Sequence, residues 1–410
     1  MPVFKLRPLL FLLLAVALAG TFFALRRPAP EPIRIGVIHA LSGVMADSER
    51  GLVDALQLAV DEINAAGGLL GRPLEMRVAD SRSDWTHAAL EAGRLIGDEQ
   101  VSALFGCWTS SCRQAVRPVV EGRQHLLFYP LQYEGMELSP HIVYLGAAPN
   151  QQVIPGARWA LERFGRRVYL LGSDYLFPRA ANLLIRDQVA GGEGSVVGER
   201  YLPMTAGDFA AVAEEIRRQA PDVIFNTLNG DSNRHFFAAL AAAGLGRIPV
   251  VSFSVAEPEL QALGSAHFHP EHYAVWGYFQ SLDNDANRQF VAHFRARFGA
   301  GRVLSDPLLS SHEAIRLWAA AVREAGTPEP EQVNRALGRV NLAGPSGIVA
   351  LDAASRHRWR RVYVGHAGRD GQFTTTELSE KPVRPAPFPP YRSRAEWNER
   401  LRPLTGSLAP

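Results

Sequence analysis

The sequence has few cysteines, almost no net charge and only one long apolar run. Two cysteines in 410 residues exclude a disulfide-stapled scaffold and a four-cysteine zinc site. The 43 Lys and Arg residues nearly balance the 41 Asp and Glu residues, so nothing points to a nucleic-acid surface. A single apolar run excludes a membrane protein with several spans. Hydrophobic residues make up 47% of the chain, which is enough for packed cores in two or three domains.

The apolar run lies at the N-terminus and has the features of an export signal. Lys5 and Arg7 precede the run Leu9–Leu25, which contains small residues suited to cleavage at Ala17–Ala19. We interpret residues 1–32 as a signal peptide or membrane anchor plus a linker. Cleavage and retention both stay open, because a run of this length is at the short limit for spanning a bilayer. Either alternative predicts that the rest of the chain lies outside the cytoplasm, in the periplasm.

From Ile33 onward, short β-rich runs alternate with amphipathic helical patterns. Such alternation builds parallel sheets that are covered by helices on both faces, and two blocks of it predict two α/β lobes. The expected strands are Ile33–Ile38, Leu74–Ala79, Val101–Gly106, His125–Tyr129, Arg167–Gly172, Ser195–Arg200, Asp222–Asn226, Pro249–Ser252 and His272–Trp276. The expected helices include Ser111–Glu121, Gln151–Phe164, Phe209–Gln219, Ser232–Ala243, Asn284–Phe298 and Pro307–Ala325.

Polar and aromatic side chains follow the expected strands of both blocks. In open parallel sheets a ligand binds beyond the carboxyl ends of the strands. The residues there are hydroxyls, carboxamides and rings with few cations, which disfavours a phosphorylated ligand and suits a small polar one. Taken singly, each of these residues also has a structural explanation as a helix cap or turn former. The segments are His39–Gly43, Cys107–Ser111, Tyr129–Gly135, Ser173–Phe177 and Asn226–Asn233.

Longer motifs surround these segments. Two of these motifs, at 35–43 and 59–68, have low specificity. The more specific ones are Phe105–Ser110, Phe128–Gly135, Gly146–Gln152, Gly172–Arg179 and Phe225–Asn233. Over residues 33–376 the sequence resembles the type I periplasmic binding proteins of the Leu/Ile/Val-binding branch. Within that branch it is similar to the substrate-binding proteins of urea ABC transporters and to the amide-sensing regulator of aliphatic amidase.

The resemblance implies an α/β architecture, the type I periplasmic-binding-protein fold. Two doubly wound parallel-sheet lobes would be joined by three crossovers and would close on one ligand. Lobe I would comprise residues 33–148 and 278–342, and lobe II residues 149–277 and 343–376. Residues 377–410 are rich in proline and are expected to form an extended C-terminal strap.

The resemblance also implies where the ligand binds. In the family a Ser or Thr of the first lobe and a Tyr of the second contact the ligand, and the matching positions are Ser110, beside Thr109, and Tyr175. Urea has two amines and one carbonyl in a plane, so its site needs acceptors, one or two donors and flanking rings. The predicted ligand-binding residues are Trp108, Thr109, Ser110, Tyr129, Gln132, Tyr133, Tyr175, Asn226, Asn229 and Asp231.

The implied function is an extracytoplasmic solute-binding protein. It would capture urea or a short-chain amide by lobe closure and deliver it to the permease of an ABC transporter, without a cofactor and without making or breaking a bond. Two alternatives stay open: a ligand sensor of the same fold that reports amide or urea availability, and a branched-chain amino-acid receptor. An enzyme is disfavoured because the sequence offers no credible nucleophile, metal or cofactor motif.

Three other groups of residues have simpler explanations. The histidines of His267–His272 have a density that could hold zinc, but a polar loop before a strand is the favoured interpretation. Asp80 and Asp84 could act in acid–base chemistry, but helix capping, by Asp84 or by Thr86, is favoured. The basic run His357–Arg361 is interpreted as a solvated strand edge.

The two cysteines lie five residues apart, around a predicted strand-to-helix turn. A disulfide between Cys107 and Cys112 is geometrically feasible in an oxidising compartment. Two separate thiols are nevertheless the default expectation. A catalytic role for Cys107 is disfavoured, because the sequence places no histidine nearby.

Overall fold

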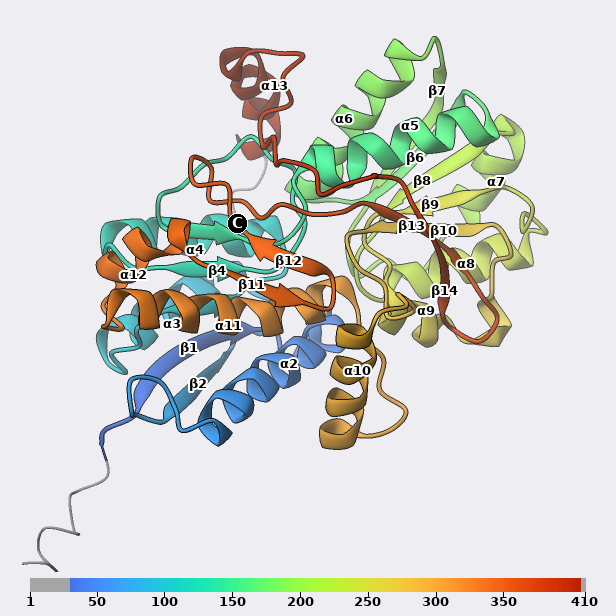
Figure 1. The fold of residues 1–410 in the computed structure, drawn as a ribbon. Helices are drawn as coiled ribbons and strands as arrows, with labels where there is room; N and C mark the ends of the chain where they lie inside the picture. The colour runs from blue at the N-terminus through green and yellow to red at the C-terminus, as the bar shows by residue number, and fades with distance from the viewer. Residues whose placement is uncertain (1–29, 407–410) are drawn as a thin grey trace, which may run out of the picture.

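The computed structural model describes residues 30–406, which form two α/β lobes side by side (Figure 1). The first lobe has a five-stranded sheet, in the order β2-β1-β3-β4-β5, in which every pair is parallel. Its strands are β1 (Ile33–His39), β2 (Leu74–Asp80), β3 (Leu104–Gly106), β4 (Leu127–Tyr129) and β5 (Ile142–Tyr144). Its helices are α2 (Ala46–Ala65), α3 (Trp85–Gly97), α4 (Ser110–Gly122), α11 (Asp306–Ala325) and α12 (Pro330–Ala336).

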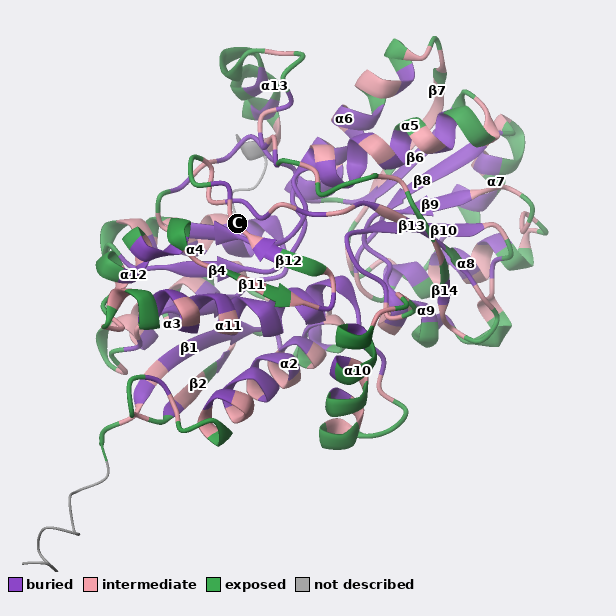
Figure 2. Cartoon of the chain, viewed as in Figure 1, coloured by how far each residue is buried: buried purple, intermediate pink, exposed green. Residues whose placement is uncertain are grey.

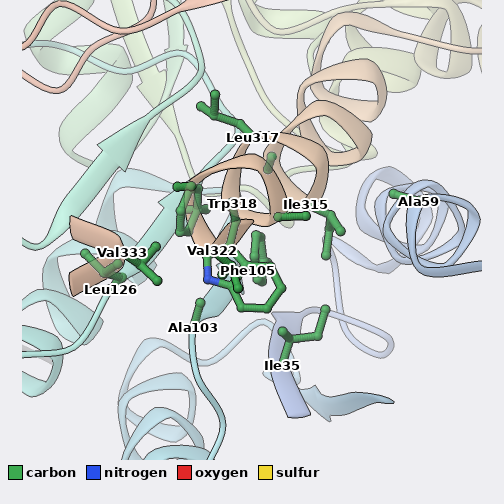
Figure 3. Close-up of a cluster of buried hydrophobic side chains, with 14 of the residues drawn as sticks. Ile35, Ala59, Ala103, Phe105, Leu126, Ile315, Leu317, Trp318, Val322 and Val333 are labelled. Carbon is green, nitrogen blue, oxygen red and sulfur yellow. The ribbon is translucent and has the colours of Figure 1, made fainter. Parts of the chain in front are cut away.

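Successive side chains along each strand of this sheet point to opposite faces, and each face packs into its own hydrophobic core. On one face Ile35 and Phe105 pack with α2, α11 and α12, and the ring of Phe105 lies edge-on to Trp318 at 6.0 Å between centroids (Figure 3). On the other face Ile38 and Leu104 pack with α3 and α4. Full burial of one such side chain stabilises the fold by about 1.5–3 kcal/mol. Both faces are therefore fixed, and the strand ends are held in place.

The second lobe has a seven-stranded sheet in the order β14-β13-β10-β9-β8-β6-β7. Five strands are parallel, and β13 and β14 add antiparallel at one edge. The strands are β6 (Arg167–Ser173), β7 (Ser195–Leu202), β8 (Val223–Thr227), β9 (Val250–Ser252), β10 (His272–Trp276), β13 (Tyr363–Ala367) and β14 (Phe373–Glu377). The helices α5 (Val153–Phe164) and α6 (Leu176–Gly191) cover one face; the other is covered by α7 (Ala210–Gln219), α8 (Ser232–Ala242) and α9 (Glu257–Leu263).

The strands and helices expected from the alternating pattern are confirmed within a few residues at each end. The α/β fold with two parallel-sheet lobes is confirmed as well. The hairpin of β11 (Asn341–Gly344) and β12 (Gly347–Ala350), which packs against α11, is not among the expected elements. Helix α13 (Arg394–Gly406) was not expected either; it follows the extended part of the tail and buries Trp397 in the core of the second lobe. The remaining helix, α10 (Asp285–Phe298), packs on α2.

Within residues 30–406 three chain segments connect the lobes: the first lies between β5 and β6, the second between β10 and α10, and the third between β12 and β13. The side chain of Arg360 lies where they meet. Its guanidinium donates to the backbone oxygen of Leu145 in the first segment and to the carboxylate of Asp306. The same carboxylate accepts from the backbone N–H of Gly277 in the second segment at 2.8 Å, and Arg360 itself belongs to the third. A Cβ at Gly277 would lie 2.6 Å from the guanidinium, so a larger residue there would displace it.

The prediction that His357–Arg361 forms a solvated strand edge is wrong. Arg358 and Arg360 are only 2% and 4% exposed. Strands at the centre of both lobes, such as β4, β6 and β8, are buried as well (Figure 2). Helix α11 supplies both counter-charges, Glu313 at 2.7 Å from Arg358 and Asp306 beside Arg360. Buried cations need such partners, and the run is therefore an internal connection between the lobes.

Candidate functional site

Loops from the carboxyl ends of both sheets touch across the boundary between the lobes. Trp108 Nε1, after β3, donates to Asn229 Oδ1, after β8, at 3.3 Å. Gln132 Nε2, after β4, donates to the backbone oxygen of Phe253, after β9, at 3.0 Å. All four residues are buried. The structure therefore brings the predicted residues Trp108, Gln132 and Asn229 together, in an arrangement with the lobes closed on each other.

Three further predicted residues support the loop that carries Trp108. The hydroxyl of Tyr129 donates to the backbone oxygen of Trp108 at 2.7 Å. The ring of Tyr133 lies edge-on to that of Tyr129, with 6.5 Å between their centroids. Thr109 is the N-cap residue of helix α4, and its side chain accepts from the backbone N–H of Cys112 at 3.1 Å. These contacts fix the direction in which the loop enters the helix.

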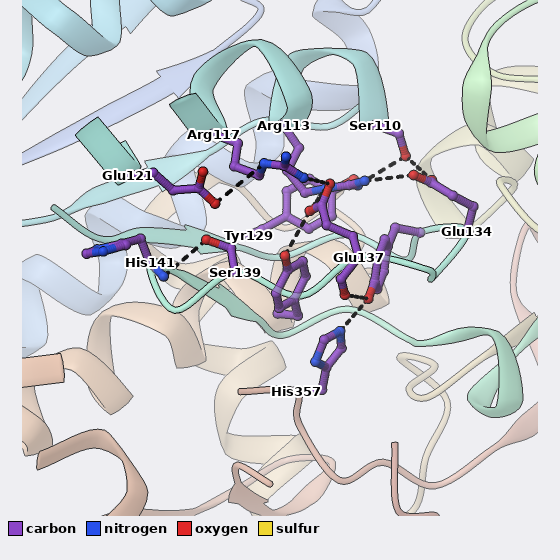
Figure 4. A network of polar contacts seen from close by, with 12 residues as sticks. Ser110, Arg113, Arg117, Glu121, Tyr129, Glu134, Glu137, Ser139, His141 and His357 are labelled. Carbon is purple, nitrogen blue, oxygen red and sulfur yellow. Dashed lines mark hydrogen bonds and ion pairs between the residues drawn. The ribbon is translucent and has the colours of Figure 1, made fainter. Parts of the chain in front are cut away.

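The predicted residue Ser110 belongs to a buried network of charges in the first lobe (Figure 4). Its hydroxyl donates to Glu134 and accepts from Arg113 Nη1 at 3.1 Å. The guanidinium of Arg113 is fully buried and pairs with Glu134 at 2.7 Å and with Glu137 at 2.9 Å. Burial opposes the Arg113 cation, but the carboxylates of Glu137 and Glu134 outweigh it and raise the pKa of Arg113 well above its ordinary value. Ser110 thus already has two partners within the protein.

The network continues to the third connecting segment. Glu137 accepts from the hydroxyl of Tyr144 at 2.8 Å, and the ring of Tyr144 stacks on His357 with 4.1 Å between centroids. The hydroxyl of Tyr133 meets His357 Nε2. Burial lowers the pKa of His357 to about 4, so the imidazole is neutral near pH 7. The buried charges around Arg113 are therefore connected, through Tyr144 and Tyr133, to the third segment that joins the lobes.

The second-lobe residue Tyr175 lies directly before α6, at the carboxyl end of β6. It is 5% exposed, and burial raises its pKa well above the ordinary value, with smaller contributions from Tyr129 and Glu134 of the first lobe. Within the described part of the chain its hydroxyl has no hydrogen-bond partner. Tyr175 therefore faces the first-lobe residues across the boundary with an unused donor.

The other two predicted residues of the second lobe are placed differently. Asn226 is buried, and its amide nitrogen donates to Asn233 at 2.9 Å and to Ser252 at 3.0 Å, which ties three elements of the second lobe together. Asp231 is exposed and lines, with Ser48 and other residues, a cavity of about 70 Å³. The structure therefore does not gather Asn226 and Asp231 with the buried residues at the boundary.

Gln152 and Ser254, which are not among the predicted ligand-binding residues, complete this region. The backbone oxygen of Phe253 also accepts from Gln152 Nε2 at 3.2 Å, and Ser254 follows it. Within residues 30–406 the atoms Gln132 Oε1, Gln152 Oε1 and Ser254 Oγ are buried without a hydrogen-bond partner. A buried polar group left unpaired costs about 1–3 kcal/mol. Ser254 could have been predicted from the sequence, because it follows the expected strand Pro249–Ser252 and ligands bind beyond the carboxyl ends of parallel strands.

The two cysteines form a disulfide, so the expectation of separate thiols is wrong. The strand-to-helix turn brings their Cα atoms to 5.5 Å, which lies within the usual range for a bridge. Cys107 directly follows β3 and Cys112 lies in the first turn of α4. The bridge consequently encloses residues 108–111, among them the predicted site residues Trp108, Thr109 and Ser110.

The remaining candidates have structural partners. Asp84 caps α3 and accepts from the backbone N–H of His87 at 2.8 Å, as predicted. His269 contacts the backbone oxygen of Ile248, and His272 contacts Ser252. Over residues 30–406, no group of three or more His, Cys, Asp or Glu side chains is arranged to hold a metal ion. No helix in that range has the length and apolar character needed to cross a bilayer. The predicted N-terminal signal or anchor lies outside the described residues.

Comparison with known sequences agrees with this architecture. A sequence profile described as a periplasmic binding protein domain matches residues 33–394. The Leu/Ile/Val-binding protein homolog 6 of Brucella melitensis is 23% identical over 377 residues, which cover 88% of this chain and 95% of that protein. A limonene hydroxylase of Geobacillus stearothermophilus is 31% identical over 117 residues, which are 28% of this chain and 21% of that protein. The chain thus spans about a fifth of the hydroxylase and nearly all of the Brucella relative.

Solved structures with the same fold include two receptors with bound solutes. A solute-binding protein of an ABC transporter from R. palustris, in complex with 4-hydroxybenzoate, is 22% identical with a TM-score of 0.76, over 87% of this chain and 98% of that one. The branched-chain amino-acid transporter substrate-binding protein LivJ from Streptococcus pneumoniae, in complex with isoleucine, is 20% identical with a TM-score of 0.77, over 85% and 99%. At these identities the likeness is one of fold.

Proposed function

This chain belongs to the periplasmic binding protein family, and we propose that it captures a small uncharged solute between its lobes and delivers it to an ABC permease. The N-terminal run of the sequence supports export, so the site of action would be the periplasm. The solute would be held at the boundary where Trp108 meets Asn229. Binding would favour the closed arrangement of the lobes, and this arrangement would be the one that the permease recognises.

The observation that carries the proposal is the chemistry of the buried side chains at the boundary. Six of them are neutral, and each contacts the opposite lobe or has an atom without a partner within residues 30–406: Trp108, Gln132, Gln152, Tyr175, Asn229 and Ser254. The buried charged groups of the first lobe nearby are paired, and burial raises the pKa of Glu257, whose Oε2 lacks a partner within residues 30–406, to about 8, so that this carboxyl is mostly neutral near pH 7. Arg113 pairs with Glu134 and Glu137, and His39 contacts Glu49 at 2.8 Å. A charged solute would need a counter-charge of its own to offset desolvation, whereas a neutral one would not.

Urea or a short-chain amide fits this set of groups. The carboxamide oxygens of Gln132 and Gln152 would accept from the amine hydrogens of the solute. The hydroxyls of Ser254 and Tyr175 would donate to its carbonyl, and the ring of Trp108 would lie against its flat face. A solute without the amine would leave both acceptors unpaired, at about 1–3 kcal/mol each, which is a basis for discrimination. A sensor that reports urea or amide availability would use the same closure.

A second candidate is a receptor for branched-chain amino acids. It is favoured by the names of the Brucella relative and of LivJ, the latter in complex with isoleucine. Such a solute carries an ammonium and a carboxylate. The buried ion pairs of the first lobe would then have to rearrange to provide the counter-charges, which argues for the neutral solute.

Calorimetric titration of the exported form with urea, acetamide, leucine, isoleucine and 4-hydroxybenzoate tests the proposal. We expect urea or acetamide to bind with a Kd in the micromolar range or tighter, and the charged solutes to give no binding heat at the same concentrations. Binding of leucine or isoleucine without urea or acetamide would establish the second candidate. Breakdown of any of these solutes would contradict both.

A further inference from the structure

We propose that the disulfide between Cys107 and Cys112 is the positioning element of the solute-binding loop. The bridge closes the segment 107–112, which contains Trp108, Thr109 and Ser110. The inference rests on the proposed function, because it concerns how tightly that site binds. The oxidised protein binds solute tightly because the loop is ordered before the solute arrives. Loss of the bridge loosens the loop and weakens binding.

The backbone at the start of this loop needs an external constraint. A Cβ at Gly106 would lie 2.0 Å from the backbone oxygen of Ile38, so the strand ends in a very close approach that only glycine allows. The next residue, Cys107, has a φ of +63°, in the left-handed region that residues with a Cβ rarely adopt. Such a conformation persists only where surrounding contacts impose it. The covalent bond to Cys112, in the first turn of α4, imposes it here.

The direction of Trp108 depends on that conformation. Trp108 directly follows Cys107, and its indole N–H reaches Asn229 in the other lobe. Its backbone oxygen accepts from Tyr129, and Ser110 is held by Glu134 and Arg113. The loop is therefore fixed at its centre and at its C-terminal side by hydrogen bonds. At its N-terminal side it is fixed by the backbone bond from Cys107 to Ile38, at 2.9 Å, and by the disulfide.

The bridge is suited to a permanent role. Cys107 is 1% exposed and Cys112 is 4% exposed, so neither sulfur is open to attack by a thiol in the closed arrangement. Two cysteines in the whole chain form this one short crosslink, and it spans only segment 107–112. A crosslink over so few residues removes little freedom from the unfolded chain compared with one that closes a long loop. Its main effect is expected on local order and on affinity.

The test compares wild-type protein with the double variant Cys107→Ala/Cys112→Ala, both free of solute and then titrated with urea and acetamide. Amide hydrogen exchange is measured for residues 107–113, with helix α7 of the second lobe, residues 210–219, as an internal control. We expect exchange in 107–113 to accelerate by about tenfold or more while the control segment is unchanged. We expect affinity to fall by a similar factor, since ordering the loop on binding opposes association.

A second variant separates positioning from general stability. Cys107→Gly/Cys112→Ala also lacks the bridge, but glycine adopts a positive φ without steric cost. If the bridge acts by holding Cys107 in that conformation, this variant recovers part of the affinity that the double-alanine variant loses. A purely structural role predicts equal affinities for the two, because neither has the crosslink. Should the double-alanine variant fail to fold, wild-type protein treated with a phosphine reductant takes its place.

Three results would overturn the inference. One is unchanged exchange and affinity in the double-alanine variant. Another is faster exchange spread over the whole first lobe with affinity intact. The third is equal affinity of the alanine and glycine variants. Failure of the proposed function looks different: wild-type protein then binds neither urea nor acetamide, and the exchange comparison of 107–113 still decides whether the bridge orders the loop.

Discussion

The two sides of the boundary between the lobes are built from different chemistry. The rim of the first lobe, which is formed by the loops after β3 and β4, is held by a buried network of charges around Arg113 and by a disulfide. On the second lobe it rests on neutral hydrogen bonds, such as those from Asn226 to Asn233 and Ser252. On the first lobe Arg113, Glu134 and Glu137 are paired with one another. The difference indicates that charge at this boundary maintains the architecture, and that neutral groups are left for the solute.

The largest expected effect comes from removing the central cation of the first rim. Arg113→Met leaves the carboxylates of Glu134 and Glu137 buried without their partner, which should lower the free energy of unfolding by about 3–5 kcal/mol. The matched change on the second rim, Asn226→Ala, should cost about 1–3 kcal/mol, since only neutral bonds are lost. Guanidinium chloride unfolding of both variants measures the difference. Equal losses would show that the two rims do not differ as described.

The next effect concerns Glu257, at the start of α9 in the second lobe. Its carboxyl accepts from the backbone N–H of Gln280 at 2.7 Å, and burial raises its pKa to about 8 from the ordinary 4.5. A raised pKa means that stability is fully present below pH 4.5 and is lost as the pH rises toward 8. Between pH 5 and 7 the wild-type protein should lose roughly 2–3 kcal/mol relative to Glu257→Gln. Parallel pH profiles for the two proteins, measured by guanidinium unfolding, would contradict this.

His357, beside the first rim, should give a pH dependence of the opposite sign. Burial lowers its pKa to about 4 from the ordinary 6.5. Its contribution to stability is therefore present above pH 6.5 and is lost as the pH falls toward 4. From pH 6.5 to 5 the wild-type protein should lose about 2 kcal/mol relative to His357→Phe, which keeps a ring against Tyr144 but does not titrate. The same unfolding series gives the answer, and a flat difference between the two proteins would refute the assignment.

The smallest expected effect is on binding alone. Tyr175→Phe removes a hydroxyl that has no hydrogen-bond partner within residues 30–406, so the stability of the solute-free protein should change by less than about 0.5 kcal/mol. Affinity for urea or acetamide should fall about tenfold, the equivalent of about 1.4 kcal/mol. Tyr363→Phe, on β13 next to the edge strand of the second sheet, is the matched control and should leave affinity unchanged. Equal calorimetric affinities of the two variants would remove Tyr175 from the site.

The sequence predicted well those features that depend on local pattern. The run Arg167–Gly172 became β6, and polar residues after strands identified Trp108 and Asn229, which meet although they are 121 positions apart. The rule worked because parallel strands end at the same edge of a sheet. It could not distinguish a side chain that faces the boundary from one that faces its own lobe, as Asn226 does.

Features that depend on distant partners could not be predicted in this way. The run His357–Arg361 has the composition of a solvated edge, and only the fold places Asp306, 54 positions away, beside Arg360. Glu134 lies within one of the recognised motifs, yet its role depends on the burial of Arg113. The pairing of the cysteines depends on the left-handed backbone at Cys107, which the residue type does not favour.

Small-angle X-ray scattering with and without solute tests most directly whether the lobes close on a neutral molecule. The account predicts that the radius of gyration of the wild-type protein falls when urea or acetamide saturates the site. It also predicts that leucine and 4-hydroxybenzoate leave the radius unchanged. A radius that stays constant while calorimetry records binding of urea or acetamide, or a decrease produced only by a charged solute, would contradict the account.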